Sequence, residues 1–319
     1  MTHQNIITVG LNPAIDYVLQ CDGFRPGYVN SGQLLARIAA GKAANVTRAL
    51  ALLGQDVVAL GLIGDCDWAF FKERLHQLGP GAVACNFNIL PQSTRQNITV
   101  LDTGVETHIR LKGFVVTEED IAAVEKRLLE TAQTGDAVIF SGSLPEGLSA
   151  LRFGQMLDVI LTRGVKVAVD TAGAALTVAL TKPLWIAKPN AEELAEVWGT
   201  GMLNTPEAIT TTVAKKACTV ENLVVSRGKL GAVLVRTDGS FSGSVPGAWQ
   251  VVRTVACGDH LLAGFSHGLW NGKSAIAALD EGLALATARA VSTNLEFFDS
   301  SIFTKVLGRG IIEPVRGHG

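Results

Sequence analysis

Short apolar runs alternate along this chain with longer segments of helical periodicity. Runs rich in β-branched residues occupy positions 5–10, 57–63, 137–141, 165–170, 184–187 and 222–226. Helical spacing occupies positions 42–53, 68–78, 118–133, 149–163, 190–198, 206–218, 274–295 and 301–307. Continuous apolar strands separated by helices are typical of repeated βαβ units. We therefore predict an α/β fold in which helices flank a mostly parallel sheet.

Two stretches interrupt this alternation, residues 11–37 and residues 88–114. Both are rich in residues that favour extended chain, and neither has a helical repeat. Because a two-stranded ribbon alone is marginally stable in water, we predict that they pair as one small sheet projecting from the main domain. Such a sheet could cover a ligand site, or it could extend an edge of the main sheet.

The overall charge is close to neutral, with 27 basic and 29 acidic residues and a formal net charge of −2. The chain has no basic block, which argues against nucleic acid or an anionic membrane surface as a partner. Its five cysteines form no Cys-x-x-Cys pair, as suits a reducing compartment, and its first residues lack a secretory pattern. We expect a cytoplasmic protein that acts on small molecules.

One candidate for chemistry is Asp259, in the stretch VRTVACGDHLLAGF. Three small residues precede it, Ala256, Cys257 and Gly258, and small residues let backbone amides approach an anion. An apolar helical stripe follows it. Aspartate is among the preferred helix N-caps, so Asp259 could be a cap, or it could be a catalytic base. This stretch alone leaves both readings open.

Polar groups also follow two other predicted strands. Lys188 and Asn190 end one strand, and Glu193 lies in the helix that follows. A lysine, an amide and a carboxylate suit phosphate and hydrated Mg²⁺, although Asn190 also suits ordinary helix capping. Ser226 and Gly228 end another strand, where a plain hairpin entry is the alternative.

A third group of candidates lies toward the N-terminus and in the following strands. Each has an ordinary alternative, such as a solvated lysine or a surface arginine on a strand. The group comprises Asp16, Gly41, Lys42, Asn45, Arg95 and Ser141. The stretch GLWNGKS is one residue short of a P-loop, and no G-x-G-x-x-G follows the first strand, which argues against those two nucleotide sites.

In their order, the motifs resemble those of the ribokinase-like (phosphofructokinase B type) sugar kinases, and within them the 1-phosphofructokinase and tagatose-6-phosphate kinase branch. The matching motifs are LNPAID, AAGKAANVTRAL, TRQNITV, SGSLPEG, VDTAGAAL, KPNAEEL, VVSRGKLGAVLV and TVACGDHLLAGF. The resemblance implies a doubly wound α/β core (1–10, 38–87 and 115–319) with a β-sheet lid (11–37 and 88–114). It also implies transfer of the ATP γ-phosphoryl group to a sugar hydroxyl, with Mg²⁺.

The resemblance further implies a role for each candidate residue. Asp259 matches the catalytic base, and the amides of Ala256, Cys257 and Gly258 match the anion hole. The positions that match the sugar-phosphate site are Asp16, Gly41, Lys42, Asn45 and Arg95, with Ser141 in a turn facing the same cleft. The positions that match the nucleotide site are Lys188, Asn190, Ser226, Gly228 and Gly231, and Asn190 and Glu193 match the Mg²⁺ region.

The sequence departs from the family pattern in two places. The anion hole, usually Gly-Ala-Gly-Asp followed by serine, here reads ACGDH from Ala256 to His260, and the usual Gly-Gly-Lys-Gly reads AGKA. A β-carbon at position 256 disfavours glycine-type backbone angles and can crowd a phosphate. His260 could add a donor near the phosphate, or it could face solvent.

Lys42 and Arg95 favour a substrate that already carries a phosphate. Within the branch that the chain resembles, the stretches AAGK and KGFVVT look most like those of 1-phosphofructokinases, which implies phosphorylation of fructose 1-phosphate to fructose 1,6-bisphosphate. The alternatives are tagatose 6-phosphate or another sugar as the substrate, or a regulatory homologue that binds sugar phosphate with impaired turnover. The sequence leaves the oligomeric state open, although an exposed lid sheet could pair with a second copy to give a homodimer through the lid.

Overall fold

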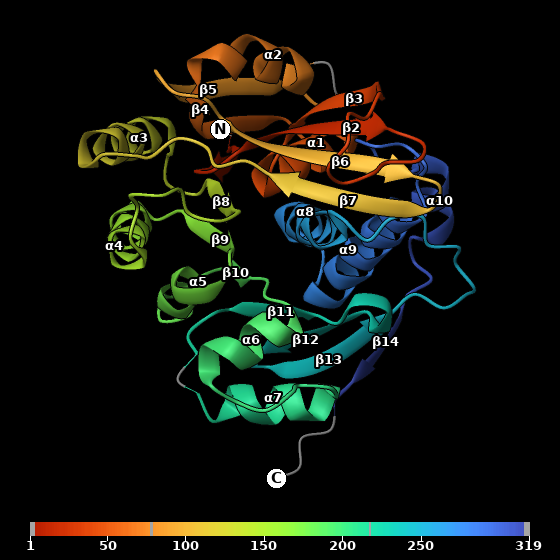
Figure 1. Cartoon of the computed structure of the whole chain (residues 1–319). Coiled ribbons are helices and arrows are strands. Elements are labelled where there is room, and N and C mark those ends of the chain that lie inside the picture. Colours follow the sequence, from red (N-terminus) through yellow and green to blue (C-terminus); the bar gives the residue numbers. More distant parts are fainter. Residues whose placement is uncertain (1–3, 77–78, 217, 316–319) are drawn as a thin grey trace.

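The computed structural model describes residues 4–76, 79–216 and 218–315, and its main sheet has the strand order β14-β13-β12-β11-β10-β9-β8-β1-β4-β5 (Figure 1). Neighbouring strands from β11 to β5 run parallel, and β12, β13 and β14 extend one edge in antiparallel fashion. The strands are β1 (Ile6–Gly10), β4 (Val57–Gly64), β5 (Val83–Leu90), β8 (Ala137–Ser141), β9 (Lys166–Asp170), β10 (Ile186–Ala187), β11 (Asn222–Ser226), β12 (Ala232–Arg236), β13 (Gly239–Ser244) and β14 (Ile311–Pro314). The mostly parallel α/β fold is confirmed.

Helices cover both faces of this sheet, as in a doubly wound fold. Their bounds are α1 (Lys42–Leu52), α2 (Asp65–His76), α3 (Glu118–Thr131), α4 (Ala150–Leu161), α5 (Gly173–Ala179), α6 (Ala191–Trp198), α7 (Pro206–Ala214), α8 (Cys257–Trp270), α9 (Ala275–Ala290) and α10 (Ser300–Val306). Helices α3 to α7 pack on one face and α1, α8 and α9 on the other. The seven-residue helix α5 and the strands β5 and β14 were absent from our sequence prediction.

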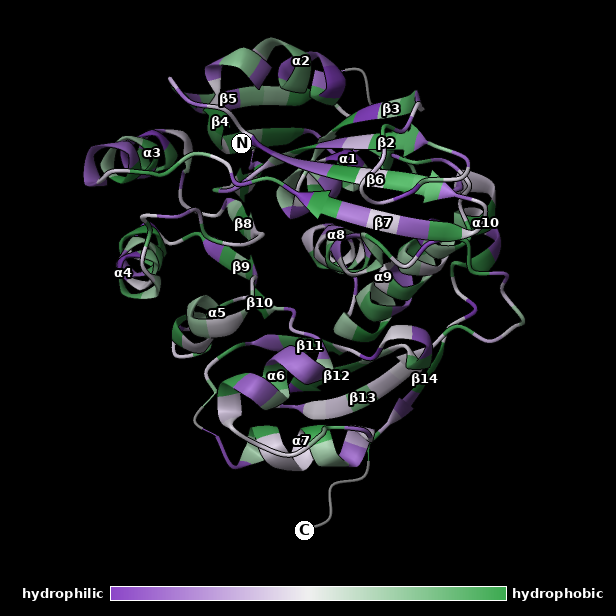
Figure 2. Ribbon diagram, in the orientation of Figure 1, coloured by the Kyte–Doolittle hydropathy of each residue, from purple (hydrophilic) through white to green (hydrophobic). Residues whose placement is uncertain are grey.

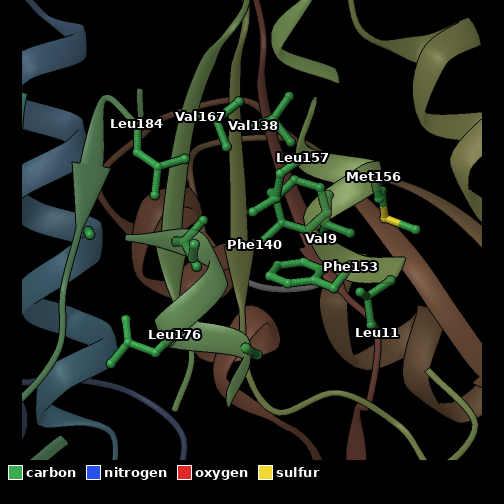
Figure 3. Close-up of a cluster of buried hydrophobic side chains, with 14 of the residues drawn as sticks. Val9, Leu11, Val138, Phe140, Phe153, Met156, Leu157, Val167, Leu176 and Leu184 are labelled. Atoms are coloured by element: carbon green, nitrogen blue, oxygen red, sulfur yellow. The ribbon is translucent and has the colours of Figure 1, made fainter. Parts of the chain in front are cut away.

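The core lies between the helices and the sheet. Strands β1 and β8 are buried along their whole length, and Figure 3 shows their side chains packed with those of α4 and α5. Phe140 and Phe153 meet there edge to face, with ring centroids 5.6 Å apart. Burial on both faces explains why these strands read as continuous apolar runs.

The two interrupting stretches form a separate sheet, which confirms their pairing and excludes the edge-extension alternative. Its order is β3-β2-β6-β7, with β2 (Ala14–Gln20), β3 (Gln33–Ala40), β6 (Arg95–Asp102) and β7 (Val105–Arg110). Strands β2 and β6 run parallel and the other pairs antiparallel. Figure 2 shows polar and apolar residues alternating along β7, the edge strand.

The boundaries of this small sheet differ from the predicted ones by three residues at two points. Residues 38–40 continue β3, in which Ile38 and Ala40 are buried, and the strand ends at Ala40, directly before the helix N-cap Gly41. Residues 88–90 belong to β5, which pairs with β4 in the main sheet. In the described part of the chain, no helix combines the length and apolar character needed to cross a membrane.

Candidate active site

A cleft of about 1440 Å³ lies between the small sheet, the ends of β10 and β11, and the start of α8. It lies at the carboxyl ends of parallel strands, where open α/β sheets bind ligands. The predicted site residues that line it are Asp16, Gly41, Lys42, Asn45, Arg95, Lys188, Asn190, Glu193, Ser226, Gly228, Gly231, Ala256, Cys257, Gly258 and Asp259. The fold thus gathers them around one space, although they come from distant parts of the chain.

Ser141 is the one predicted residue outside that lining. It lines a separate cavity of about 10 Å³, which Gly41 and Lys42 also border. Ser141 is buried, and its Oγ makes no hydrogen bond to any residue that the structure describes. A cavity of this size holds about one water molecule, and Ser141 thus lies beside the cleft residues Gly41 and Lys42 but outside the cleft lining.

Asp259 does not cap the helix that it begins. The N-cap of α8 is Ala256, and Asp259 is the third helical residue. The residue is 5% exposed, and its Oδ2 accepts a hydrogen bond from Asn45 Nδ2 at 2.7 Å. The capping interpretation is therefore wrong, because the side chain turns toward α1 and the cleft.

Two lysines and a second carboxylate lie beside this pair. Asp170, at the end of β9, is fully buried and accepts a hydrogen bond from Lys42 Nζ at 2.9 Å. The Nζ of Lys188 lies 3.4 Å from the same oxygen. Gly258 leaves room for that ammonium group, since a Cβ at Gly258 would lie only 3.1 Å from Nζ. The site thus contains two ammonium groups and two carboxylates.

Asp170 was not among the residues predicted from the sequence, although a signal was present. It closes the predicted strand 165–170, in the motif VDTAGAAL. Acids at the carboxyl end of a parallel strand point toward the ligand edge of the sheet. The same reasoning that selected Ser226 and Lys188 would have found it.

Burial sets the protonation of these groups. Burial, followed by the charge of Asp170, raises the pKa of Asp259 to about 6, although Asn45 and the two lysines oppose the shift. For Lys42, burial lowers the pKa, but the charges of Asp170 and Asp259 outweigh it and the net pKa is raised. Asp259 can therefore exchange a proton near neutral pH beside a permanently charged lysine.

Ala256 has a left-handed backbone conformation, with φ 66° and ψ 2°. This conformation costs a residue with a side chain about 1–2 kcal/mol, whereas glycine adopts it freely. The first amide groups of a helix have no partner within the helix. Cys257 and Gly258, the first two residues of α8, both line the cleft, so their amide groups can serve as hydrogen-bond donors to an anion.

His260 points away from the cleft. It is 1% exposed, its Nδ1 donates to the carbonyl oxygen of Ala256 at 2.8 Å, and its ring meets Phe298 edge to face. Burial lowers the pKa of His260 to about 3, so the ring is neutral. Both expectations for His260, a phosphate donor and a solvent-facing side chain, are wrong because the residue belongs to the core.

The small sheet brings a second polar group into the cleft. The parallel register of β2 and β6 pairs Asp16 with Asn97, and Asn97 Nδ2 donates to Asp16 Oδ1 at 2.7 Å. Burial raises the pKa of Asp16, against the hydrogen bond from Asn97 and the charge of Arg95. The Nε of Arg95 donates to two backbone carbonyls, and Arg110 of β7 completes this wall.

Asn97 and Arg110 line the cleft but were not among the residues predicted from the sequence. Asn97 lies two residues after Arg95 in the same strand, so the period of two could have placed both on one face. For Arg110 the antiparallel register supplies the reason, since it pairs with Asn97 across β6 and β7. That register depends on the turn between the strands, which the sequence left uncertain.

Asn190 and Glu193 cap α6 in the structure. Asn190 Oδ1 accepts from the Glu193 amide at 2.7 Å, and Glu193 Oε2 accepts from the Asn190 amide at 2.8 Å. Both also line the cleft, and Asn190 forms a bridge to Ser226 of the neighbouring strand. Among the described residues no donor bonds Glu193 Oε1, so an amide oxygen and a carboxylate oxygen fit the hard ligands that Mg²⁺ prefers.

The loop after β11 also approaches the cleft through its glycines. Gly228 and Gly231 have φ of 56° and 82°. A Cβ at Gly231 would lie 2.0 Å from the carbonyl oxygen of Gly243, so only glycine fits there. The loop therefore runs close to β13 and presents backbone to the cleft.

Comparison with known proteins gives one consistent family. The sequence model for pfkB family carbohydrate kinases matches residues 3–297. The chain is 29% identical over 315 residues to a 1-phosphofructokinase of Haemophilus influenzae, covering 98% of this chain and 99% of that protein. It is 31% identical over 266 residues to one of Vibrio cholerae, covering 83% of each.

Solved structures show the same fold. Phosphofructokinase-2 from Escherichia coli in complex with potassium has a TM-score of 0.88 at 22% identity, covering 96% of this chain and 98% of that one. A putative phosphofructokinase from Staphylococcus aureus has a TM-score of 0.83 at 26% identity, covering 98% and 100%.

Proposed function

The chain belongs to the pfkB family of carbohydrate kinases, phosphotransferases with an alcohol acceptor, and we propose that it transfers the γ-phosphoryl group of ATP to fructose 1-phosphate, giving fructose 1,6-bisphosphate. The observation that carries this proposal is the buried carboxylate of Asp259. One of its oxygens accepts from Asn45, and the residue stands at the start of α8 beside the cleft. Such a carboxylate can take a proton from a sugar hydroxyl.

In the proposed reaction, Asp259 accepts the proton of the attacking hydroxyl. A bond forms between that oxygen and the γ-phosphorus, the bond to the β-phosphate oxygen breaks, and ADP leaves. Phosphoryl transfer depends mainly on positioning and charge stabilisation. The amides of Cys257 and Gly258 serve the moving phosphoryl group, and the ammonium groups of Lys42 and Lys188 add positive charge nearby.

Mg²⁺ would be held beside the nucleotide by Asn190 and Glu193, directly or through water. When bound, it offsets charge on the phosphates. Lys188, Ser226, Gly228 and Gly231 would bind the nucleotide phosphates. The cleft volume of about 1440 Å³ exceeds the range typical of a single small-ligand pocket, which suits two substrates bound together.

The small-sheet wall suits a phosphosugar. Arg95 and Arg110 can bind the existing phosphate, for which the planar guanidinium is well matched. Asp16 and Asn97 can bind sugar hydroxyls, and Gly41 has no Cβ to obstruct the approach. Three relatives named 1-phosphofructokinase match at 29%, 31% and 29% identity, which supports fructose 1-phosphate as the first choice over tagatose 6-phosphate.

We also propose that the small sheet is a lid and that two copies pair through it. Several of its apolar side chains are exposed, including Leu34, Val105 and Ile109 at 52%, 63% and 43%. A second copy would remove them from water. One solved structure of Escherichia coli phosphofructokinase-2 is described as tetrameric, so assembly occurs in that protein.

One observation favours a second candidate function, a sugar-phosphate-binding regulator with impaired turnover. Ala256 adopts a backbone conformation suited to glycine, and the residue lines the cleft beside Cys257 and Gly258. A crowded anion site would retain ligand binding while slowing phosphoryl transfer.

An ATP-coupled assay separates these functions. Fructose 1-phosphate, fructose 6-phosphate, tagatose 6-phosphate and free fructose are each supplied with Mg²⁺-ATP, and ADP release is followed. We expect the highest kcat/KM with fructose 1-phosphate. Binding of sugar phosphate by calorimetry without turnover of any sugar would favour the regulator.

A further inference from the structure

A buried arginine lies directly behind the proposed base. Arg48 follows Asn45 by one turn of α1 and is 1% exposed. Its Nη1 donates to Asn45 Oδ1 at 3.0 Å, and its Nη2 donates to the carbonyl oxygen of Ala39. Arg48 does not line the cleft, and of its hydrogen bonds to described residues only the one to Asn45 reaches a residue of the cleft lining.

The chemistry of the three groups fixes the orientation of the Asn45 amide from both ends. A guanidinium has donors only, so the end of the amide that faces Arg48 must be its oxygen. An ionised carboxylate has acceptors only, so the end that faces Asp259 must be the nitrogen. In a flipped amide, the Asn45 oxygen would face the Asp259 carboxylate, which is also an acceptor. The Asn45 nitrogen would face the Arg48 guanidinium, which is also a donor. Without the guanidinium of Arg48, the side-chain amide of Asn45 would be less restricted in its orientation.

From this arrangement we infer that Arg48 is a positioning residue for the catalytic base: it holds the Asn45 amide nitrogen on Asp259 Oδ2 and so leaves Oδ1 for the sugar hydroxyl. The inference rests on the proposed role of Asp259. Arg48 also bonds Ala39 in β3, so one guanidinium fixes both the end of the small sheet and the amide that faces the base.

The surroundings of Arg48 support a specific role over simple packing. Burying a charge without a close partner is unfavourable, and among the described residues no carboxylate lies within 4 Å of its guanidinium. The charged groups that face it are Glu296, Asp16, Arg289 and Arg74. Burial lowers the pKa of Arg48 to about 10, so it remains a cation and a pure donor at neutral pH.

A kinetic comparison tests the inference. Arg48→Met keeps the length of the side chain and removes its donors, and Arg48→Lys restores a donor without the planar fork. Arg74→Met is the matched control, because Arg74 also lies in the charged group around Glu296 but does not contact Asn45. For each variant, kcat, both KM values and the acid limb of the pH profile are measured, with thermal melting as a check of folding.

We expect Arg48→Met to lower kcat about 10–100-fold, as for other groups that orient a reacting side chain, with the KM for ATP within about twofold. Its acid limb should move to higher pH, because Asp259 loses a fixed donor while Asp170, Lys42 and Lys188 remain around it. Arg48→Lys should recover part of both effects. Arg74→Met should leave the limb in place. An unmoved limb in folded Arg48→Met overturns the inference.

A double-mutant cycle gives a second, independent test. If Arg48 acts through Asn45, then Arg48→Met should change kcat less than twofold in an Asn45→Ala background. If the two substitutions instead lower kcat by independent factors that multiply in the double mutant, the inference is overturned. If Arg48→Met does not fold, the same cycle is run with Arg48→Lys.

One readout does not need activity, so it separates this inference from the proposed function. The difference in unfolding free energy between the chain and its Asp259→Asn variant follows the ionisation of Asp259 with pH. In the Arg48→Met background the midpoint of that difference should move to higher pH. A chain that phosphorylates no sugar yet shows this shift would contradict the kinase proposal and retain the inference. An unchanged midpoint would contradict the inference alone.

Discussion

Asn45 Nδ2 donates to Asp259 Oδ2 at 2.7 Å, across 214 residues of sequence. The bond joins the start of α1 to the start of α8, the two helices that begin at the cleft. It leaves one carboxylate oxygen of Asp259 for a ligand. The first predictions concern this carboxylate.

Asp259→Asn should lower kcat by roughly 10²–10⁴-fold, the range attributed to general-base catalysis, with ATP affinity nearly unchanged. The variant should also be more stable at pH 8, because the raised pKa means that burial opposes the charged form. The gain is on the order of 1–3 kcal/mol. Steady-state kinetics, ATP titration and thermal melting provide the three measurements. Unchanged turnover would show that Asp259 is not the base.

Activity should rise with pH through about 6 and then level, because the base must be ionised and the pKa of Asp259 is raised to about 6. Stability should change in the opposite direction. A carboxyl group with a raised folded-state pKa contributes stability below its ordinary value near 4, and this stability is lost as pH rises through 6. A pH profile of kcat/KM and urea unfolding over the same range test the two trends. If Asp259→Asn retained the same stability trend, the assignment to Asp259 would be wrong.

Asp170→Asn should move the acid limb to lower pH, because the charge of Asp170 helps to raise the pKa of Asp259. This variant is also the control for the substrate, since a sugar phosphate itself titrates near pH 6 and its pKa would not move. The substitution leaves Lys42 and Lys188 without their shared carboxylate, so stability should fall by roughly 3–5 kcal/mol. If the acid limb of the pH profile does not move in Asp170→Asn, the limb is due to ionisation of the substrate phosphate.

Ala256→Gly should raise stability by about 1 kcal/mol and maintain or raise kcat, because the left-handed backbone is free of strain in glycine. The matched control is Ala277→Gly on the exposed face of α9, which should lower stability by about the same amount. Thermal melting and kinetics of both variants provide the comparison. A large loss of kcat in Ala256→Gly would show that the anion site requires alanine.

Ile109→Glu in β7 should convert a dimer into a monomer if two copies pair through the small sheet. Burying a new carboxylate in that interface is unfavourable. Leu151→Glu is the control, since Leu151 is 70% exposed on α4 and lies outside the small sheet. Light scattering after gel filtration gives the mass. A monomeric parent chain, or a dimer that withstands Ile109→Glu, would contradict the pairing.

The alternation of strands and helices could be predicted from sequence because buried parallel strands leave continuous apolar runs. The small sheet could also be predicted, since its two stretches lack a helical repeat. The short helix α5 was missed because its seven residues, GAALTVA, carry little periodicity. Strand β5 was missed because Asn86 and Asn88 interrupt the apolar run VACNFNIL, whereas the other main-sheet strands that were predicted are apolar almost throughout.

At the site, sequence identified residues at the ends of strands and starts of helices, and the fold brought them together. Sequence could not identify which side chains meet. The partner of Asp259 on α1 and the contact of His260 with Phe298 depend on packing between distant segments. At position 256, the sequence indicated only that alanine stands where the family pattern has glycine. The left-handed backbone conformation of Ala256 became clear from the structure.

The spread of the site along the chain has a consequence for how the protein matures. Lys42 and Asn45, Asp170, Lys188 and Asp259 come from four separate stretches, and α8 is among the last elements to be synthesised. During translation, the early strands of a nascent chain can form before Asp259 is synthesised. Asn45 and the two lysines are then present without the Asp259 carboxylate beside them. Because such long-range contacts form late in folding, regain of activity should lag behind regain of helical content after dilution from denaturant.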